Sequence, residues 1–150
     1  MKKINFLLIA IIFVGTTLVS SCKKEDKIEK NLWKKGGEWN IESFVSKLIS
    51  TYQPDLFDET VYNIGTYTFN ENGSGSYLIT YDGFSETETF TYSNTEDKLT
   101  FIIDNEAKVF DIIESEKNEI KISYTGNFYE GIENSVGTRT YTETVMLKKK

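Results

Sequence analysis

The chain has 150 residues, 14% of them aromatic, with 17 basic against 23 acidic side chains and a formal net charge of −6. This is the length of one ordinary domain, and the negative balance argues against a nucleic-acid partner, because phosphate binding needs clustered positive side chains. The absence of histidine excludes Ser-His-Asp and Cys-His catalysis and histidine metal sites, so we expect neither an enzyme nor a metal-binding protein.

Residues 1–21 have the pattern of a secretory signal peptide. Lys2 and Lys3 precede an apolar run over residues 7–14. The run is too short, and has the wrong flanks, for a membrane-spanning helix of about 20 apolar residues. We therefore expect residues 1–21 to be removed as a signal peptide.

The end of this segment, Ser20-Ser21-Cys22, resembles the lipobox of bacterial lipoproteins. The resemblance implies a diacylglyceryl thioether and an acylated amine on Cys22, and hence a lipid anchor in the outer membrane, on its outer or periplasmic face. Two or more acyl chains anchor a protein almost permanently. The alternatives are a soluble secreted protein with a chance cysteine and an uncleaved membrane anchor. Because Cys22 is the only cysteine, we expect no disulfide.

Residues 22–36 are mostly charged, and we expect the early part to be a tether that cannot bury itself. Lys23-Lys24-Glu25-Asp26 resembles the surface-export signal of Bacteroidetes lipoproteins, although a merely solvated spacer explains the same residues. Leu32 and Trp33 are apolar, and we expect them to cap one end of the domain that follows.

Two interpretations compete after Gly37. Trp39 and Ile41 favour an extended start, so we expect a strand over Glu38–Ser46. The apolar residues beyond it are spaced like one face of a helix, so we predict a short helical turn from there to Pro54. The apolar positions concerned are Ile41, Phe44, Val45, Leu48, Ile49 and Tyr52.

Alternating apolar and polar residues separated by short turn signals then predict a series of antiparallel strands. A change of face near Gly65 indicates a β-bulge or sharp bend there. Strands that follow one another through hairpins usually close, since an open sheet leaves two unpaired edges. We therefore predict an all-β domain over residues 37–150, an up-and-down barrel of about eight strands. The expected ranges after the first are Val61–Asn70, Gly75–Tyr81, Phe84–Ser93, Lys98–Asp104, Lys108–Glu114, Glu119–Thr125 and Thr138–Lys148.

Gly37-Glu38-Trp39 resembles the Gly-x-Trp signature of lipocalins. The segment Tyr67–Gly75 resembles the second hairpin of the lipocalin-like lipoproteins common in the Bacteroidetes. The resemblance implies a calycin-type barrel and a small apolar ligand. It also implies a basic side chain across Trp39, for which Arg139 and Lys148 are the two candidates. No helix is expected after the last strand.

Inward aromatic side chains are the candidate ligand-binding residues, although side chains of this kind more often form a plain hydrophobic core. Buried tyrosines need hydrogen-bond partners, which suggests a polar group on a ligand or trapped water. The candidates are Trp39, Tyr67, Phe69, Tyr77, Phe90, Tyr92 and Phe101, with Ile79 and Leu99 completing the inward set.

Three further features have competing interpretations. Asn70, Asn72 and Ser74 faintly resemble a calcium loop, but a hairpin turn is the simpler explanation. Glu86 and Glu88 could form a glycosidase-like acid pair, or be solvated charge. The expected long loops 51–59 and 126–137 carry apolar side chains. They could form a lid, a surface for an envelope protein, or a covering of the barrel rim.

The sequence thus supports two functional hypotheses. In the first, a lipid-anchored lipocalin-like barrel binds a small apolar ligand. In the second, the barrel is filled and its loops make it a non-enzymatic interaction module of the outer membrane.

Overall fold

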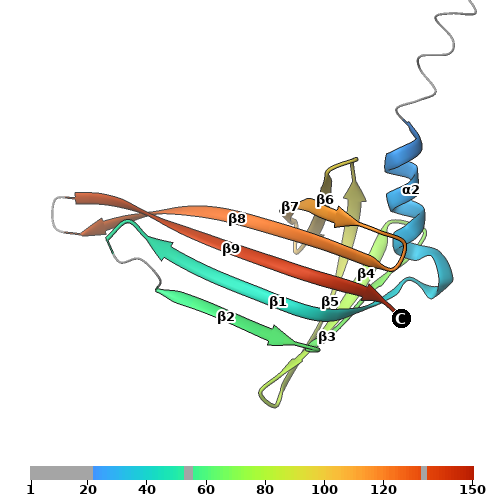
Figure 1. Ribbon diagram of the computed structural model, residues 1–150, viewed down its shortest axis with the longest axis horizontal. Coiled ribbons are helices and arrows are strands. Elements are labelled where there is room, and N and C mark those ends of the chain that lie inside the picture. Colours follow the sequence, from blue (N-terminus) through green and yellow to red (C-terminus); the bar gives the residue numbers. More distant parts are fainter. Residues whose placement is uncertain (1–21, 53–55, 133–134) are drawn as a thin grey trace, which may run out of the picture.

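The computed structural model describes residues 22–52, 56–132 and 135–150, and its helical part precedes an all-β domain (Figure 1). Helix α2 is followed by the 3-10 turn η1 and by nine strands. Their bounds are α2 Cys22–Trp33, η1 Lys34–Gly36, β1 Glu38–Ser50, β2 Phe57–Tyr62, β3 Gly65–Phe69, β4 Ser74–Tyr81, β5 Phe84–Asn94, β6 Lys98–Ile103, β7 Glu106–Ser115, β8 Glu119–Ile132 and β9 Ser135–Lys149.

The strands close into a barrel through the pairing of β1 with β9. All neighbours are antiparallel and follow chain order from β3 to β9. On its other edge, β1 pairs first with β3 and then with β2, so these two strands occupy successive parts of one barrel position. The result is a closed eight-stranded up-and-down barrel, which confirms the predicted fold class.

The predicted bend near Gly65 is the gap between β2 and β3. Asn63 has a positive φ of 54°, and its N–H donates to the carbonyl of Glu42. A Cβ at Gly65 would lie 1.9 Å from the Leu78 carbonyl oxygen. The chain therefore changes face at a glycine because a side chain there would collide with β4.

The predicted helical turn after Ser46 is wrong. β1 continues to Ser50, with β2 on one edge and β9 on the other, so that Leu48 lies opposite both Phe57 and Tyr141. The helix-like spacing arises because the register shifts between Ile41 and Ser43. A bulge of this kind puts inward residues three positions apart instead of two.

The two expected long loops are largely strand. β8 reaches Ile132 and β9 begins at Ser135, with Phe128 opposite Arg139, while Phe57–Glu59 belong to β2. In Figure 1, β1, β2, β8 and β9 extend well beyond the shorter strands, on the side away from α2. The apolar side chains in these segments therefore stand on a projecting sheet. Residues 53–55 and 133–134 lie outside the described residues.

The expected tether also folds. Residues 22–33 form α2, which stands at one end of the barrel (Figure 1), and Ile28 and Leu32 are 5% and 0% exposed. Their spacing of four residues puts both side chains on one helix face. A segment rich in charge is thus ordered by two apolar residues, and the expectation that Leu32 caps the domain is confirmed. The signal segment, residues 1–21, lies outside the described residues.

Candidate functional site

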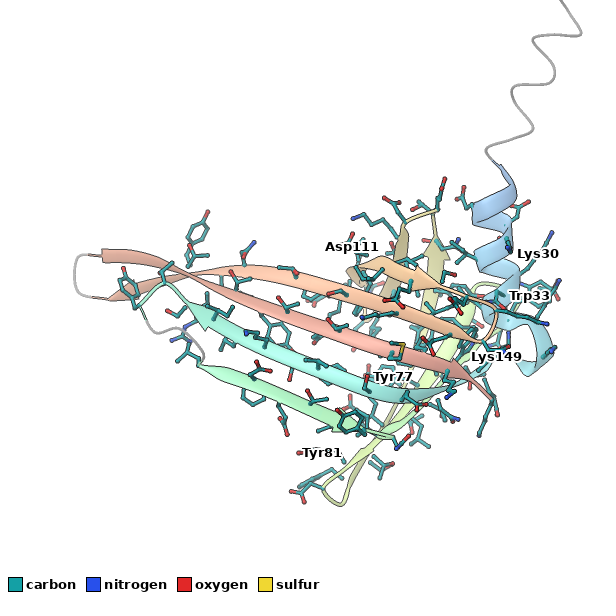
Figure 2. The ribbon with its side chains drawn as sticks, in the orientation of Figure 1. Lys30, Trp33, Tyr77, Tyr81, Asp111 and Lys149 are labelled. Atoms are coloured by element: carbon teal, nitrogen blue, oxygen red, sulfur yellow. The ribbon has the colours of Figure 1, made fainter. Side chains whose placement is uncertain are left out.

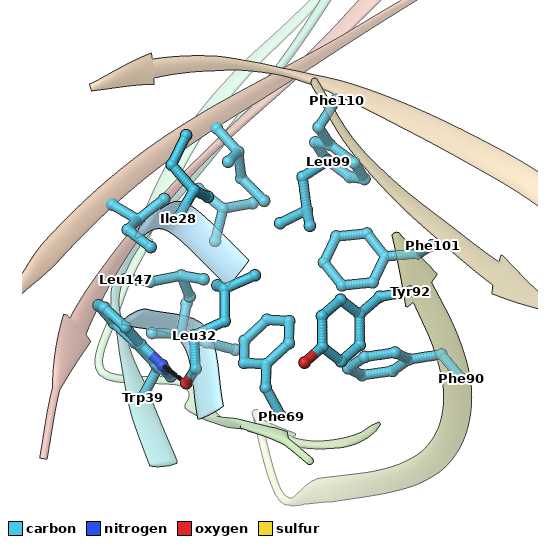
Figure 3. Close-up of a cluster of buried hydrophobic side chains, with 14 of the residues drawn as sticks. Ile28, Leu32, Trp39, Phe69, Phe90, Tyr92, Leu99, Phe101, Phe110 and Leu147 are labelled. Carbon is cyan, nitrogen blue, oxygen red and sulfur yellow. Dashed lines mark hydrogen bonds between the residues drawn. The ribbon is translucent and has the colours of Figure 1, made fainter. Parts of the chain in front are cut away.

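Helix α2 closes one end of the barrel interior. Leu32 packs among the buried side chains there, and the indole Nε1 of Trp39 donates a hydrogen bond of 2.8 Å to the Leu32 carbonyl oxygen (Figure 3). This carbonyl is one of the last in the helix and has no partner within it. Trp39 therefore holds the helix end and the barrel floor together, and we call this the closed end.

The cation beside Trp39 is Lys149, not Arg139 or Lys148. Its Nζ lies 4.8 Å from the centre of the Trp39 ring and donates to the Asn31 carbonyl oxygen. Figure 2 shows Lys149 beside the lower end of α2. Arg139 lies at the other end of β9, opposite Ser50 in the strand register, and Lys148 is exposed. The resemblance thus implied the correct contact, but the register places it one residue beyond the predicted Lys148.

Aromatic rings fill the middle of the barrel (Figure 3). Phe90 and Phe101 meet edge to face at 4.9 Å between ring centres, as do Phe69 and Tyr92 at 5.1 Å. A Cβ on Gly75 would lie 2.4 Å from the Phe90 ring, so this glycine makes room for it. Of the predicted ligand-lining residues, Trp39 and these four are at most 8% exposed and form the core.

The hydroxyl of Tyr92 has a hydrogen-bond partner within the protein. It donates a hydrogen bond of 2.7 Å to the Asn70 carbonyl oxygen. Burial, with a smaller effect of the Glu29 charge, raises the pKa of Tyr92 to about 12. The phenol therefore stays protonated at neutral pH and acts as a donor, as a buried tyrosine requires.

Tyr67 is partly buried and lies at the edge of this core. Its ring contacts those of Phe69, Phe90, Phe101 and Tyr77, with ring centres between 5.7 and 6.0 Å apart. Burial, and then the charge of Glu143, raise the pKa of its hydroxyl. No described residue is hydrogen-bonded to that hydroxyl. Tyr67 thus presents a polar atom above an apolar floor.

A charged cluster lies beside Tyr67 on β7 and β9. Glu143 is only 9% exposed, and its carboxylate accepts hydrogen bonds from Lys108 and, at 2.8 Å, from the hydroxyl of Tyr141. The Lys108 ammonium lies 4.8 Å from the ring centre of Tyr124 on the intervening strand β8. A buried carboxylate is stable only when it is paired and hydrogen-bonded, and both conditions are met here.

Further from α2, tyrosines donate to carboxylates across the strands. The hydroxyl of Tyr77 lies 3.1 Å from Glu86, and that of Tyr81 lies 2.7 Å from Glu59 on β2. Figure 2 shows Tyr81 near the tip of the β4–β5 hairpin. Burial first, and then the hydrogen bond to Glu86, raise the pKa of Tyr77. We call this region, with Tyr67 and the Glu143 cluster, the far end of the barrel interior.

The Asn72 segment is a hairpin turn, as the simpler interpretation predicted. The Asn70 N–H donates to the Ser74 carbonyl at 2.8 Å, and the Ser74 N–H donates to the Asn72 side chain at 3.1 Å. The three side chains that faintly resembled calcium ligands are therefore hydrogen-bonded within the turn. Among the described residues, no three acidic or cysteine side chains are grouped as a metal site would require.

The projecting sheet carries exposed aromatic side chains. Phe128 and Tyr129 on β8 are 54% and 89% exposed, and Phe57 on β2 is 43% exposed. Sequence reasoning identified these residues but expected them on loops. Their placement on paired strands holds them in a fixed arrangement, away from α2.

Lys108, Glu143 and Tyr141 were not among the predicted site residues. A signal was present, because Glu143 stands between Tyr141 and Val145 at the same two-residue spacing that predicted an inward face. A carboxylate at an inward position of a barrel strand indicates either a buried pair or a ligand contact.

The model of the lipocalin-like domain family matches residues 36–122, more than half of the chain. The chain therefore belongs to this family, in agreement with the closed barrel and with Trp39 near its start. No curated protein matches the sequence. In the part of the chain that the structure describes, no helix has the length and apolar character needed to cross a membrane.

Proposed function

We propose that this protein is a lipid-anchored lipoprotein of the cell envelope whose lipocalin-like barrel binds a small, largely apolar molecule at its far end. The observation that carries the proposal is that the residues lining the barrel change from aromatic to polar between the core and the far end. Packed rings give way at Tyr67 to tyrosines that are half-buried or exposed and to carboxylates, of which only Glu143 is buried. A few convergent polar groups beside an apolar floor are typical of small-molecule sites.

Affinity and orientation come from different groups in this proposal. Burying apolar ligand surface against the Tyr67 and Tyr77 rings contributes about 25 cal/mol per Å². The Tyr67 hydroxyl, which has no described partner, orients the ligand by a hydrogen bond. The buried rings Trp39, Phe69, Phe90, Tyr92 and Phe101 support this floor from below. The role is binding and not catalysis.

The anchor is proposed at Cys22, the first residue of α2. A helix rises about 1.5 Å per residue, so the 12 residues of α2 span roughly 18 Å. Because α2 packs into the barrel, the acylated end would be joined to the domain by a helix instead of a flexible tether. In this arrangement the closed end carries the lipid, and the protein is attached to the outer membrane.

Replacement of the acylated residue tests the anchor. Cys22→Ser is expected to abolish labelling by a fatty-acid probe and to release the protein from membranes, because no other cysteine can form the thioether. Persistent labelling would refute the assignment. Protease treatment of whole cells then distinguishes a surface-exposed protein from a periplasmic one.

Native mass spectrometry of the delipidated protein, purified from its own host, tests ligand binding. The proposal expects a retained mass of a few hundred daltons that is released on unfolding. Protein of the bare chain mass from several preparations would contradict it.

The exposed aromatic residues favour a second candidate function, an interaction module whose barrel is filled. Phe128 and Tyr129 are exposed on opposite faces of β8, because successive strand residues alternate. Each offers a rigidly held aromatic side chain of the kind that protein interfaces use. In that case a Phe128→Ser, Tyr129→Ser double variant would lose a partner that is cross-linked in the envelope, while Thr125→Ala on the same strand would keep it.

A further inference from the structure

We infer that the ligand of the far end carries a positively charged head group, an amine or a related cation, on an apolar body. This inference rests on the proposed function, and it concerns only the chemistry of the molecule bound there. The inference follows from the charged side chains that point into the barrel next to its aromatic core.

Carboxylates occupy the inward positions of three strands at the far end. Phe90 is buried, so the residues two and four before it on β5, Glu88 and Glu86, share its inward face. Their partners across the ladder are Tyr77 and Ile79, which pack against the core. Glu59 on β2 is the third carboxylate of this group and accepts a hydrogen bond from Tyr81. Glu143 on β9 is the fourth carboxylate.

The two described cations on the same face, Lys108 and Arg139, are fewer than its four carboxylates. Lys108 is used by Glu143 and is covered by the rings of Phe110 and Tyr124. Arg139 lies four residues before Glu143 on β9, opposite Ser50. The far end therefore has more negative than positive side chains.

The tyrosines satisfy hydrogen bonds without removing the charge. Tyr77 and Tyr81 donate to Glu86 and Glu59 as neutral phenols, since each carboxylate raises the pKa of the phenol bonded to it. No described cation pairs with Glu88, whose charge also raises the pKa of Tyr77. A carboxylate beside aromatic rings is a favourable environment for a ligand cation.

A second observation supports a ligand at this position. The Tyr67 hydroxyl lies at the boundary between the packed rings and the carboxylates, and it has no hydrogen-bond partner among the described residues. Because no fully buried polar side-chain atom in the described part of the chain lacks a partner, this hydroxyl keeps some exposure and can form a hydrogen bond with a bound molecule. A ligand whose apolar part rests on the Tyr67 ring can supply that partner.

Three probes with the same eight-carbon tail test the inference: octylamine, octanol and octanoate. The protein is the chain from residue 22 to 150 with Cys22→Ser, which contains every described element and has no acyl chain. By calorimetry, octylamine is expected to bind at least tenfold more tightly than octanoate, with octanol between them. This preference should shrink as salt is raised, because salt screens charge attraction.

Glu88→Gln provides the matched variant. It should weaken octylamine binding about threefold or more and leave octanol binding unchanged. Glu71→Gln makes the same charge change at an exposed turn position and should alter neither.

Equal binding of the three probes, or a preference for octanoate, would overturn the inference and leave the proposed function standing. The same holds if octylamine binding is unaffected by Glu88→Gln. If none of the probes binds, octanol included, the inference fails and so does the proposed apolar site at the far end.

Discussion

Lys149 shows how one side chain can join three parts of the fold. It lies over the Trp39 ring on β1, donates to the Asn31 carbonyl of α2, and belongs to β9 itself. The charge is therefore used for contact with an aromatic face and a helix end instead of for an ion pair. Such contacts are worth about 0.5–2 kcal/mol when partly desolvated.

Lys149→Met should lower the free energy of unfolding by about 1–2 kcal/mol, because the apolar stem is kept while the cation is lost. Urea denaturation followed by tryptophan fluorescence measures this change. Lys148→Met is the matched control. The Lys148 ammonium is exposed and its contact with Glu42 is long, at 3.9 Å, so this substitution should lower the free energy of unfolding much less. An equal loss for both variants would show that the position over Trp39 has no special role.

Tyr92 makes the stability depend on alkaline pH. Its pKa is about 12 in the folded protein and about 10 in an unfolded chain. Between these values the unfolded chain releases its proton first, so stability is fully present below pH 10 and falls as pH rises toward 12. The urea midpoint should therefore decline over this range.

The comparison with Tyr92→Phe isolates this residue from the other groups that titrate at high pH. The variant loses the hydrogen bond to the Asn70 carbonyl at every pH, but its midpoint should decline less steeply between pH 10 and 12. Parallel declines in the two proteins would contradict the assignment.

At the level of elements, α2 is an integral part of the domain. Leu32 is fully buried and Ile28 nearly so, whereas Lys30 between them is exposed. Removing a buried leucine side chain costs about 2–5 kcal/mol. Leu32→Ala should therefore destabilise the barrel by this amount, although residue 32 precedes the first strand.

Lys30→Ala is the control on the same helix and should change the unfolding free energy by no more than about 0.5 kcal/mol. Limited proteolysis offers a second measurement, since Leu32→Ala should expose α2 to cleavage before the strands. If the Leu32 variant is as stable and as resistant as the wild type, α2 does not contribute to the core.

The elements also show where sequence reasoning succeeds and where it stops. Strand alternation located the ladder from β3 to β7 closely, and the glycine at position 65 revealed the break between β2 and β3. The tether and the helical turn after Ser46 were predicted wrongly for physical reasons. The many charged residues of α2 favoured a solvated tether, although Ile28 and Leu32 are spaced to share one helix face. In β1, a bulge puts inward residues three positions apart, which resembles helical spacing.

For the candidate site, the aromatic residues were predicted but their roles were not. Alternation tells which face a side chain takes, so the seven inward aromatics were found. It does not tell how deep a residue lies, which separates the packed Phe90 from the half-buried Tyr77. Contacts between strands distant in sequence, such as Lys108 with Glu143, depend on the register of all the strands between them.

At the scale of the whole molecule, the barrel has two different ends. Helix α2 and Trp39 close one, and tyrosines and carboxylates line the other, beyond which β1, β2, β8 and β9 project (Figure 1). If the single cysteine carries lipid, no disulfide is available to the fold. Ring packing and the β1–β9 closure must then supply its stability.

Amide NMR of residues 22–150 during titration with octanol tests the central claim most directly, because octanol probes the apolar site without depending on charge. The account predicts saturable shifts at Tyr67, Tyr77 and their neighbours on β3, β4 and β5, with α2 unaffected. Shifts confined to Phe128 and Tyr129, or none at all, would contradict binding at the far end of the barrel.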